Sequence, residues 1–133
     1  MSKPKVYFLK DVTPENIVKI FDVLKPDLPG KIAIKVHTGE DGNKNFIRPE
    51  FWKPIVDKVG GTVVECNAAY PGLRHETELH KQLLEKHEWN KYFKVDIMDE
   101  KPEEDIEVAI PDGFKMKRIS LVNILKIITQ VWF

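Results

Sequence analysis

The chain has 133 residues, of which 21 are basic and 21 acidic, so its formal net charge at neutral pH is zero. This length suits one domain, and the balanced charge gives no overall field that would attract nucleic acid or an anionic membrane surface. The sequence contains no signal peptide and no apolar run near the roughly 20 residues needed to span a bilayer. We therefore expect a cytoplasmic protein with no nucleic-acid or membrane partner.

The first half of the chain predicts strands and a helix in alternation. A buried strand is expected over Lys5–Leu9, and a helix capped by Thr13 follows it and ends near Pro26. The next strand, Lys31–Val36, ends abruptly in a polar loop that is punctuated by glycines.

The second half continues the same alternation. Helices are expected over Arg48–Gly60 and Thr77–Trp89, and strands over Thr62–Cys66, Lys94–Met98 and Ile106–Ile110. Strands that alternate with helices predict an α/β fold with a mostly parallel sheet flanked by helices. In such sheets ligands bind beyond the carboxyl ends of the strands, which directs attention to the loops after them.

Two of these loops, with the strand ends before them, carry the side chains that we take as candidate ligand-binding residues. They are Lys35, His37, Thr38, Glu40, Asn45 and Arg48 in the first region, and Glu65, Asn67, Tyr70 and Arg74 in the second. An imidazole, a carboxylate and a guanidinium near one strand end can bind an anion or move a proton. A solvated loop ahead of a capped helix would carry the same residue types.

Glu65 and Cys66 lie at the end of a strand that is expected to be buried. A buried carboxylate needs a partner, and Lys35 on the neighbouring strand is the expected one. Cys66 is expected to be a small core residue, with a reactive thiol as the alternative.

Metal and cofactor signatures are weak in this sequence. A single cysteine excludes an internal disulfide and any all-cysteine metal or iron–sulfur site within one chain. The glycines match neither the dinucleotide fingerprint nor the phosphate loop, and His75, His80 and His87 lack the i, i+4 spacing of a helical metal site. We expect no metal and no cofactor in this chain, and we place these histidines on a solvated face.

Four strings in chain order carry a resemblance to a known family. They are Val36-His37-Thr38-Gly39-Glu40, Asn45-Phe46-Ile47-Arg48-Pro49-Glu50-Phe51, Val64-Glu65-Cys66-Asn67-Ala68-Ala69-Tyr70 and Asp96-Ile97-Met98-Asp99-Glu100. They resemble the N-terminal part of domain of unknown function family 362, from about Val6 to Lys117. The resemblance implies uncharacterised, iron–sulfur-associated relatives that have a later cysteine-rich module and a segment rich in histidine, lysine and glycine. A 4Fe–4S cluster is thus implied for longer members, and this chain is expected to be a truncated member with an incomplete sheet.

The last residues do not continue the resemblance. We therefore divide the chain into an α/β domain over residues 1–118 and an atypical apolar tail over 119–133. One permissible set of codons for this tail, read one base out of frame, encodes the Asn-Phe-Val-Gly that the resemblance implies, so we interpret the tail as a frameshift product. The downstream DNA tests this hypothesis. The tail predicts a terminal helix, and its apolar character, together with an exposed sheet edge, favours a homo-oligomer.

Three functional hypotheses remain open from the sequence. The chain is a redox-linked or ligand-binding enzyme domain that is incomplete, a non-catalytic module for a small molecule or anion, or a truncated remnant held folded by oligomerisation. An autonomous enzyme ranks lowest because no complete catalytic constellation is visible. The shared site predicts that His37 and Glu65 lie close together.

Overall fold

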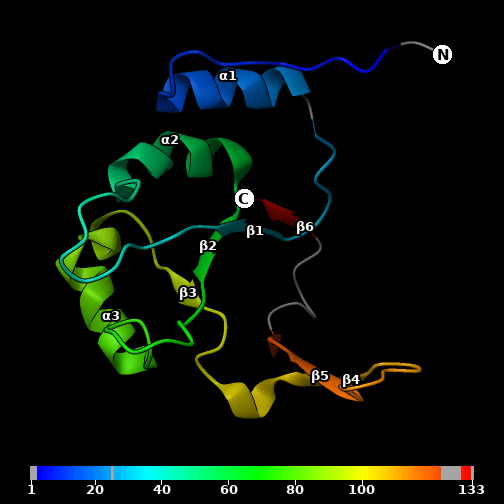
Figure 1. Ribbon diagram of the computed structural model, residues 1–133. Coiled ribbons are helices and arrows are strands. Elements are labelled where there is room, and N and C mark those ends of the chain that lie inside the picture. Colours follow the sequence, from blue (N-terminus) through cyan, green and yellow to red (C-terminus); the bar gives the residue numbers. More distant parts are fainter. Residues whose placement is uncertain (1–2, 25, 124–129, 133) are drawn as a thin grey trace.

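The computed structural model describes residues 3–24, 26–123 and 130–132, and it has the predicted α/β architecture. Figure 1 shows a small parallel sheet with helices packed against it and a separate two-stranded hairpin. No helix among the described residues is long and apolar enough to cross a membrane.

The sheet has the strand order β3-β2-β1-β6, and every neighbouring pair in it is parallel. Its strands are β1 (Ile32–Lys35), β2 (Thr62–Glu65), β3 (Asp96–Ile97) and β6 (Gln130–Trp132). In the register of β1 with β2, Lys35 pairs with Val64. Both strands therefore end at the same edge of the sheet, one residue apart in register.

Three α-helices accompany the sheet: α1 (Pro14–Leu24), α2 (Pro49–Val59) and α3 (Thr77–Lys86). Thr13 caps α1 as predicted, because its hydroxyl accepts a hydrogen bond of 3.2 Å from the backbone N–H of Asn16. Gly60 ends α2 in the left-handed conformation that this residue tolerates best. Figure 1 shows α1 lying across α2, on the side away from the sheet.

One hydrophobic core joins the strands to the helices. Ile34 and Val63 from neighbouring strands are buried in the same cluster as Leu84 of α3. Trp89 completes this cluster from a 3-10 turn, η1 (Trp89–Lys91), and it is fully buried. The core thus holds β1 and β2 rigidly against the segment that follows α3.

The expected strand over Lys5–Leu9 is wrong. These residues have no regular secondary structure, and Val6 and Phe8 are largely exposed to solvent, Val6 by 91%. The edge of β1 that such a strand would occupy is paired with β6 instead. Apolar composition alone therefore predicted a strand that this sheet does not include, because β6 takes the place beside β1.

Two other predicted elements are shorter than expected. The third helix ends at Lys86 rather than Trp89, because Glu88 adopts a positive φ of 65° that a helix cannot continue through. The fourth strand is limited to Asp96–Ile97. A second 3-10 turn, η2 (Pro102–Glu104), lies in the acidic segment that follows this strand.

The C-terminal region also differs from the prediction. The expected fifth strand is β4 (Ile106–Ala109), and it pairs antiparallel with β5 (Arg118–Leu121) outside the parallel sheet. The predicted terminal helix is wrong where the tail is described, since β5 and β6 are strands. Residues 124–129 and 133 of that predicted helix lie outside the described residues. Extended chain suits this region because its β-branched residues favour a pleated surface.

Candidate functional site

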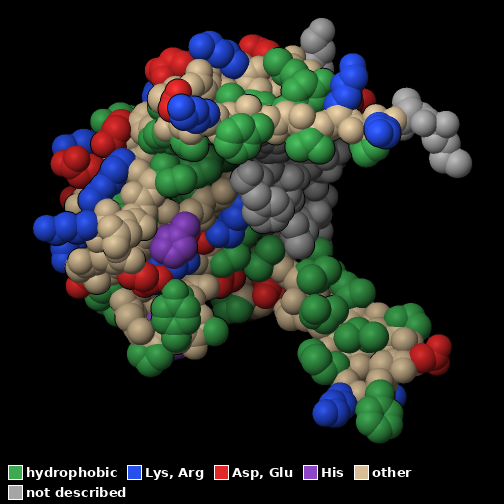
Figure 2. Space-filling view, turned by 45° about the horizontal axis from the view of Figure 1, so that its top comes forward, with side chains coloured by type: hydrophobic (Ala, Val, Ile, Leu, Met, Phe, Trp, Pro, Cys, Tyr) green, Lys and Arg blue, Asp and Glu red, His purple; other side chains and the backbone are tan. Residues whose placement is uncertain are grey.

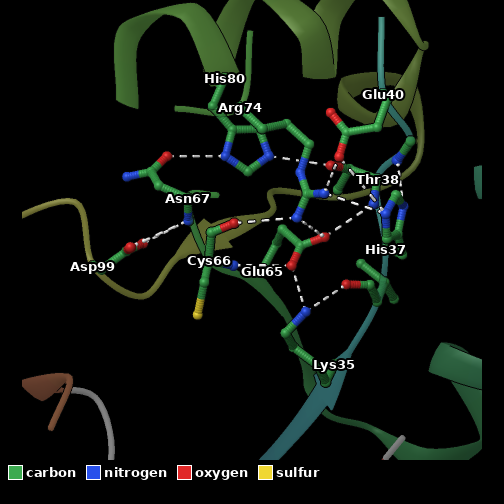
Figure 3. Close-up of polar contacts among 12 residues, drawn as sticks. Lys35, His37, Thr38, Glu40, Glu65, Cys66, Asn67, Arg74, His80 and Asp99 are labelled. Carbon is green, nitrogen blue, oxygen red and sulfur yellow. Dashed lines mark hydrogen bonds and ion pairs between the residues drawn. The ribbon is translucent and has the colours of Figure 1, made fainter. Parts of the chain in front are cut away.

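The two loops that carry the candidate residues converge at the carboxyl edge of β1 and β2 (Figure 3). Arg74 joins them: its guanidinium lies 3.2 Å from Nε2 of His37 and 3.3 Å from a carboxylate oxygen of Glu65. His37 and Glu65 therefore lie close together, as the shared-site hypothesis requires. Parallel pairing of β1 with β2 produces this arrangement, because it brings the residues after both strands to one edge.

Glu65 is the buried centre of the cluster, with 1% of its surface exposed. Its carboxylate accepts hydrogen bonds from Lys35 Nζ and from the backbone N–H groups of Thr38 and Cys66, the latter two at 3.0 Å. The predicted Lys35–Glu65 pair is thus confirmed. Because Arg74 also faces this carboxylate, Glu65 is fully satisfied and orders the loops rather than reaching for a ligand.

Arg74 is buried and binds both loops together. It donates to Glu40 Oε1 at 2.5 Å and to the carbonyl oxygen of Cys66 at 3.4 Å. Its Nε–H is also buried and has no hydrogen-bond partner among the described residues. With Lys35, Arg74 balances the two carboxylates of Glu40 and Glu65, so the interior of the cluster is close to neutral.

Glu40 and Tyr70 form the outer part of the cluster. The Tyr70 hydroxyl donates to Glu40 at 2.6 Å, and this hydrogen bond is the main reason that the pKa of Tyr70 is raised. Burial alone would raise the pKa of Glu40, but the hydrogen bonds from Tyr70 and Arg74 outweigh it and leave that pKa lowered. Glu40 is therefore a carboxylate at neutral pH.

Both ring nitrogens of His37 face N–H donors. Its Nδ1 accepts a hydrogen bond of 2.9 Å from the backbone N–H of Gly39, so a neutral ring carries its proton on Nε2. That Nε2–H faces another donor, Arg74, at 3.2 Å, while the nearest carboxylate oxygen, on Glu40, is 3.9 Å away. The side chain is 57% exposed. In this tautomer the Nε2–H of His37 has no hydrogen-bond acceptor among the described residues.

A second set of polar contacts links Thr38, His80 and Asn67. Thr38 Oγ1 lies 3.1 Å from His80 Nε2, and His80 Nδ1 lies 3.1 Å from Asn67 Oδ1. The Asn67 amide nitrogen donates to Thr77, which leaves its oxygen to accept from His80 Nδ1–H and lets Nε2 accept from the threonine. Burial lowers the pKa of His80, so its ring is neutral.

This connectivity is that of a nucleophile, a base and an orienting amide. However, Thr38 and His80 are both fully buried, so a substrate cannot reach the hydroxyl. The set therefore stabilises the loops and has no access for catalysis.

The prediction that His80 lies on a solvated face was wrong. Other residues that contact the site were not predicted from the sequence. His80 shares a helical face with Leu83 and Leu84, and that 3–4 residue spacing is the signal that could have placed it inside. Trp89 Nε1–H donates to the Thr38 carbonyl at 3.0 Å, and His87 Nδ1 lies 2.9 Å from the same oxygen. His87 is thus half-buried, whereas His75 is exposed as predicted.

Asp99 ties a third loop to the cluster. Its carboxylate accepts hydrogen bonds of 2.9 and 3.2 Å from the backbone N–H of Asn67. The loop after β3 therefore supports the loop after β2, in line with the expectation that strand-end loops meet. Asp99 lies in one of the strings that carry the family resemblance, but its long-range contact has no local sequence signal.

Cys66 lacks the surroundings of a reactive thiol. Burial raises its pKa, and the nearby Asp99 carboxylate adds to the effect, so the thiol is protonated at neutral pH. In Figure 3 its sulfur points away from Arg74 and the carboxylates. Cys66 is only partly buried and lies outside the core cluster, so its predicted core position is not confirmed, and its protonated thiol does not favour the nucleophile either.

Arg48 and Asn45 do not join the buried cluster. The Arg48 guanidinium lies 4.2 Å from the centre of the Phe46 ring and is exposed. Asn45 is also exposed, but it borders a hollow of about 420 Å³ beside the cluster. The residues that line this hollow are Lys35, Val36, His37, Asn43, Asn45, Phe46, Ile47 and Trp52.

No group of three or more His, Cys, Asp or Glu side chains among the described residues is suited to hold a metal ion. The iron–sulfur cluster implied for longer relatives does not fit the residues of this chain, because one cysteine cannot supply its thiolate ligands.

Comparison with known proteins places the chain by its sequence. No curated protein and no solved structure matches it. The family described as "Domain of unknown function (DUF362)" matches residues 32–131. The match begins later than the expected Val6, and it continues past Lys117 into the region of β5 and β6. Because it covers well over half of the chain, this protein belongs to the DUF362 family.

Proposed function

We propose that this domain is a non-catalytic binding module that takes a small organic anion in the hollow beside the carboxyl end of β1. The observation that carries this proposal is the imidazole of His37. The Gly39 N–H occupies its Nδ1, and its Nε2–H faces Arg74 instead of an acceptor. A ligand oxygen beside Nε2 would accept this hydrogen bond and separate two facing donors.

Other donors around the hollow support an acceptor-rich ligand. Lys35 donates to Glu65 and to the carbonyl of Val36, which leaves one proton of its ammonium group for a further acceptor. The indole N–H of Trp52 is buried and has no partner among the described residues. Both side chains line the hollow together with His37.

The hollow combines these donors with an apolar wall. Its volume lies within the range of about 300–1,000 Å³ that is usual for small-molecule sites. Phe46, Ile47 and Trp52 supply apolar surface, and Asn43 and Asn45 supply neutral polar groups. A carboxylate or phosphate attached to a flat, apolar body would match both parts.

Binding without catalysis is favoured by the state of the candidate nucleophiles. Thr38 is buried beyond the reach of a substrate, and the Cys66 thiol is protonated. Glu65, the most buried carboxylate, already has four donors and cannot act as a free base. The site therefore has groups that position an anion and lacks a group poised to attack it.

Calorimetric titration with benzoate tests the proposal, with benzamide as a neutral probe of the same shape and phosphate as an anion without an apolar body. We expect saturable binding of benzoate and weaker binding of benzamide. Asn45→Asp should weaken benzoate binding about tenfold, because it adds a negative charge at the rim. The matched control is Asn90→Asp, an exposed asparagine on η1.

A second variant removes the donor itself. His37→Phe keeps a planar ring without the Nε2–H and should weaken benzoate binding more than benzamide binding. The proposal is wrong if neither anion binds at millimolar concentration, or if Asn45→Asp and Asn90→Asp bind benzoate equally well.

A further inference from the structure

The hairpin of β4 and β5 projects from the rest of the described structure (Figure 1). Its register pairs Ile106 with Leu121 and Val108 with Ile119. Residues directly opposite each other in an antiparallel pair point to the same face, and so do residues two apart on one strand. These four side chains therefore form one wholly aliphatic face of the ribbon.

The opposite face of the hairpin is polar. Glu107 pairs with Ser120 in the register and forms an ion pair with Arg118. The hairpin is thus an amphipathic ribbon, a pattern that in folded proteins indicates burial of the apolar side.

The aliphatic face remains open to solvent. Val108 and Ile119 are 39% and 41% exposed, and in the turn that joins the strands Phe114 is 94% exposed and Met116 is also exposed. Figure 2 shows these hydrophobic side chains gathered on the projecting hairpin. An isolated two-stranded ribbon is marginally stable in water, and apolar patches of a few hundred Å² mark interaction sites. This face therefore requires a covering surface.

The charges at the two ends of the ribbon indicate what covers it. At its base, the segment from Asp99 to Asp105 contains five carboxylates and one lysine, and Glu100 and Glu104 among them pair with lysines of the same chain. At its tip, Lys115 and Lys117 outnumber Asp112. If two ribbons pack face to face and antiparallel about a two-fold axis, the basic tip of each lies over the acidic base of the other.

We propose that the hairpin is the interface of a homodimer, in which the aliphatic faces of two copies pack antiparallel. A two-fold contact needs a self-complementary surface, and this ribbon has one in both shape and charge. Dimerisation through the hairpin does not depend on ligand binding at the carboxyl edge of β1, which lies on a different part of the chain.

The size of the surface is enough for a small specific interface. Phe114 by itself offers roughly 150–250 Å², and the aliphatic face and the turn add a few hundred more on each copy. With the charged ends included, two copies reach the roughly 1,000–1,200 Å² at which specific interfaces begin. We expect a reversible dimer with a dissociation constant in the micromolar range.

Sedimentation equilibrium of the intact chain over a micromolar concentration series tests the proposal. Ile119→Glu should raise the dissociation constant at least tenfold, because it places a charge in the centre of the aliphatic face. The matched control is Val6→Glu, which adds the same charge at an exposed valine outside the hairpin and should leave the constant unchanged. Circular dichroism reports whether each variant retains its fold.

A charge swap tests the antiparallel arrangement without altering the apolar packing. Lys115→Glu and Glu103→Lys should each weaken the dimer severalfold, and the double variant should recover most of the loss. Such recovery supports contact between the tip of one copy and the base of the other. A monomeric wild type at the highest concentration, equal effects of Ile119→Glu and Val6→Glu, or additive losses in the double variant would each overturn the proposal.

Discussion

The carboxyl edge of β1 and β2 and the β4–β5 hairpin use the same kinds of residue in opposite environments. At the edge, Glu65 is buried, and Lys35 and two backbone N–H groups donate to its carboxylate. In the hairpin, Glu107 and Arg118 pair on the surface, and the aliphatic side chains behind them face solvent. The cost of breaking an ion pair therefore differs between the two regions, because it rises with burial, and the hairpin lacks the covering surface that the edge has.

The largest expected effect is the loss of folding stability when a buried carboxylate is neutralised. An exposed carboxylate in the hairpin provides the comparison. Glu65→Gln removes the carboxylate that Lys35 pairs with and leaves Arg74 with Glu40 alone, and we expect a loss of about 3–5 kcal/mol in the free energy of unfolding. Glu107→Gln makes the same chemical change in the hairpin and should cost less than about 1 kcal/mol. Urea unfolding measures both, and equal losses would contradict the comparison.

The second prediction concerns the pH dependence that His80 gives to stability. Burial and the charge of Arg74 lower its folded-state pKa, against smaller opposing effects of Glu65, Asp99 and Glu40. The unfolded chain therefore takes up a proton below about pH 6.5 that the folded chain does not. Stability should fall as the pH falls from about 6.5 toward the lower folded-state pKa.

Two variants isolate this effect in urea titrations at several pH values. His80→Asn should cost about 1–3 kcal/mol by leaving buried partners unsatisfied, and it should remove the slope below pH 6.5. His75→Asn, at an exposed position, should keep the slope. A slope that survives in His80→Asn would assign it to another group.

The third prediction compares two glycines in the loop after β1. Gly39 has a φ of +91°, and a Cβ there would lie 2.5 Å from the Phe46 ring, which lines the hollow. Gly39→Ala should therefore cost about 2 kcal/mol and also weaken benzoate binding. Gly42→Ala shares the positive φ but meets no atom within 4 Å, so its cost should be about 1 kcal/mol with binding retained. A larger loss at Gly42 would contradict the described loop.

The smallest expected effect is a shift in titration at the outer part of the cluster. The hydrogen bond to Glu40 raises the pKa of Tyr70, so Glu40→Gln should lower that pKa toward its usual value. The difference in ultraviolet absorbance between the wild type and Tyr70→Phe identifies this tyrosine. An unchanged titration in Glu40→Gln would mean that the hydroxyl does not bond to Glu40 in solution.

The sequence was sufficient to predict which side chains meet at the carboxyl edge of β1 and β2. It was insufficient to predict how the strands of the hairpin pair. Parallel strands bring their carboxyl ends together by rule, so the Lys35–Glu65 pair follows from the order of elements alone. The strand expected at Lys5–Leu9 and the helix expected in the tail failed for a different reason. Both depended on which segment pairs with the free edge of β1, and local hydrophobic patterns do not decide that competition.

Side chains that act across long distances were the hardest to place. Arg74 was a candidate, but its central position between Glu40 and Glu65 depends on how the loop after β2 folds back. Asp99 reaches the backbone of Asn67 from a third loop and was not selected. Contacts of this kind depend on tertiary packing, which a single sequence does not display.

Nuclear magnetic resonance titration with benzoate tests most directly whether the carboxyl edge of β1 binds an anion. Shifts should concentrate on the amide of Gly39 and the indole N–H of Trp52, with the hairpin amides of Val108 and Ile119 unaffected by benzoate at fixed protein concentration. Absence of shifts at Gly39 and Trp52, or shifts centred on the lysines of the hairpin turn, would contradict the account.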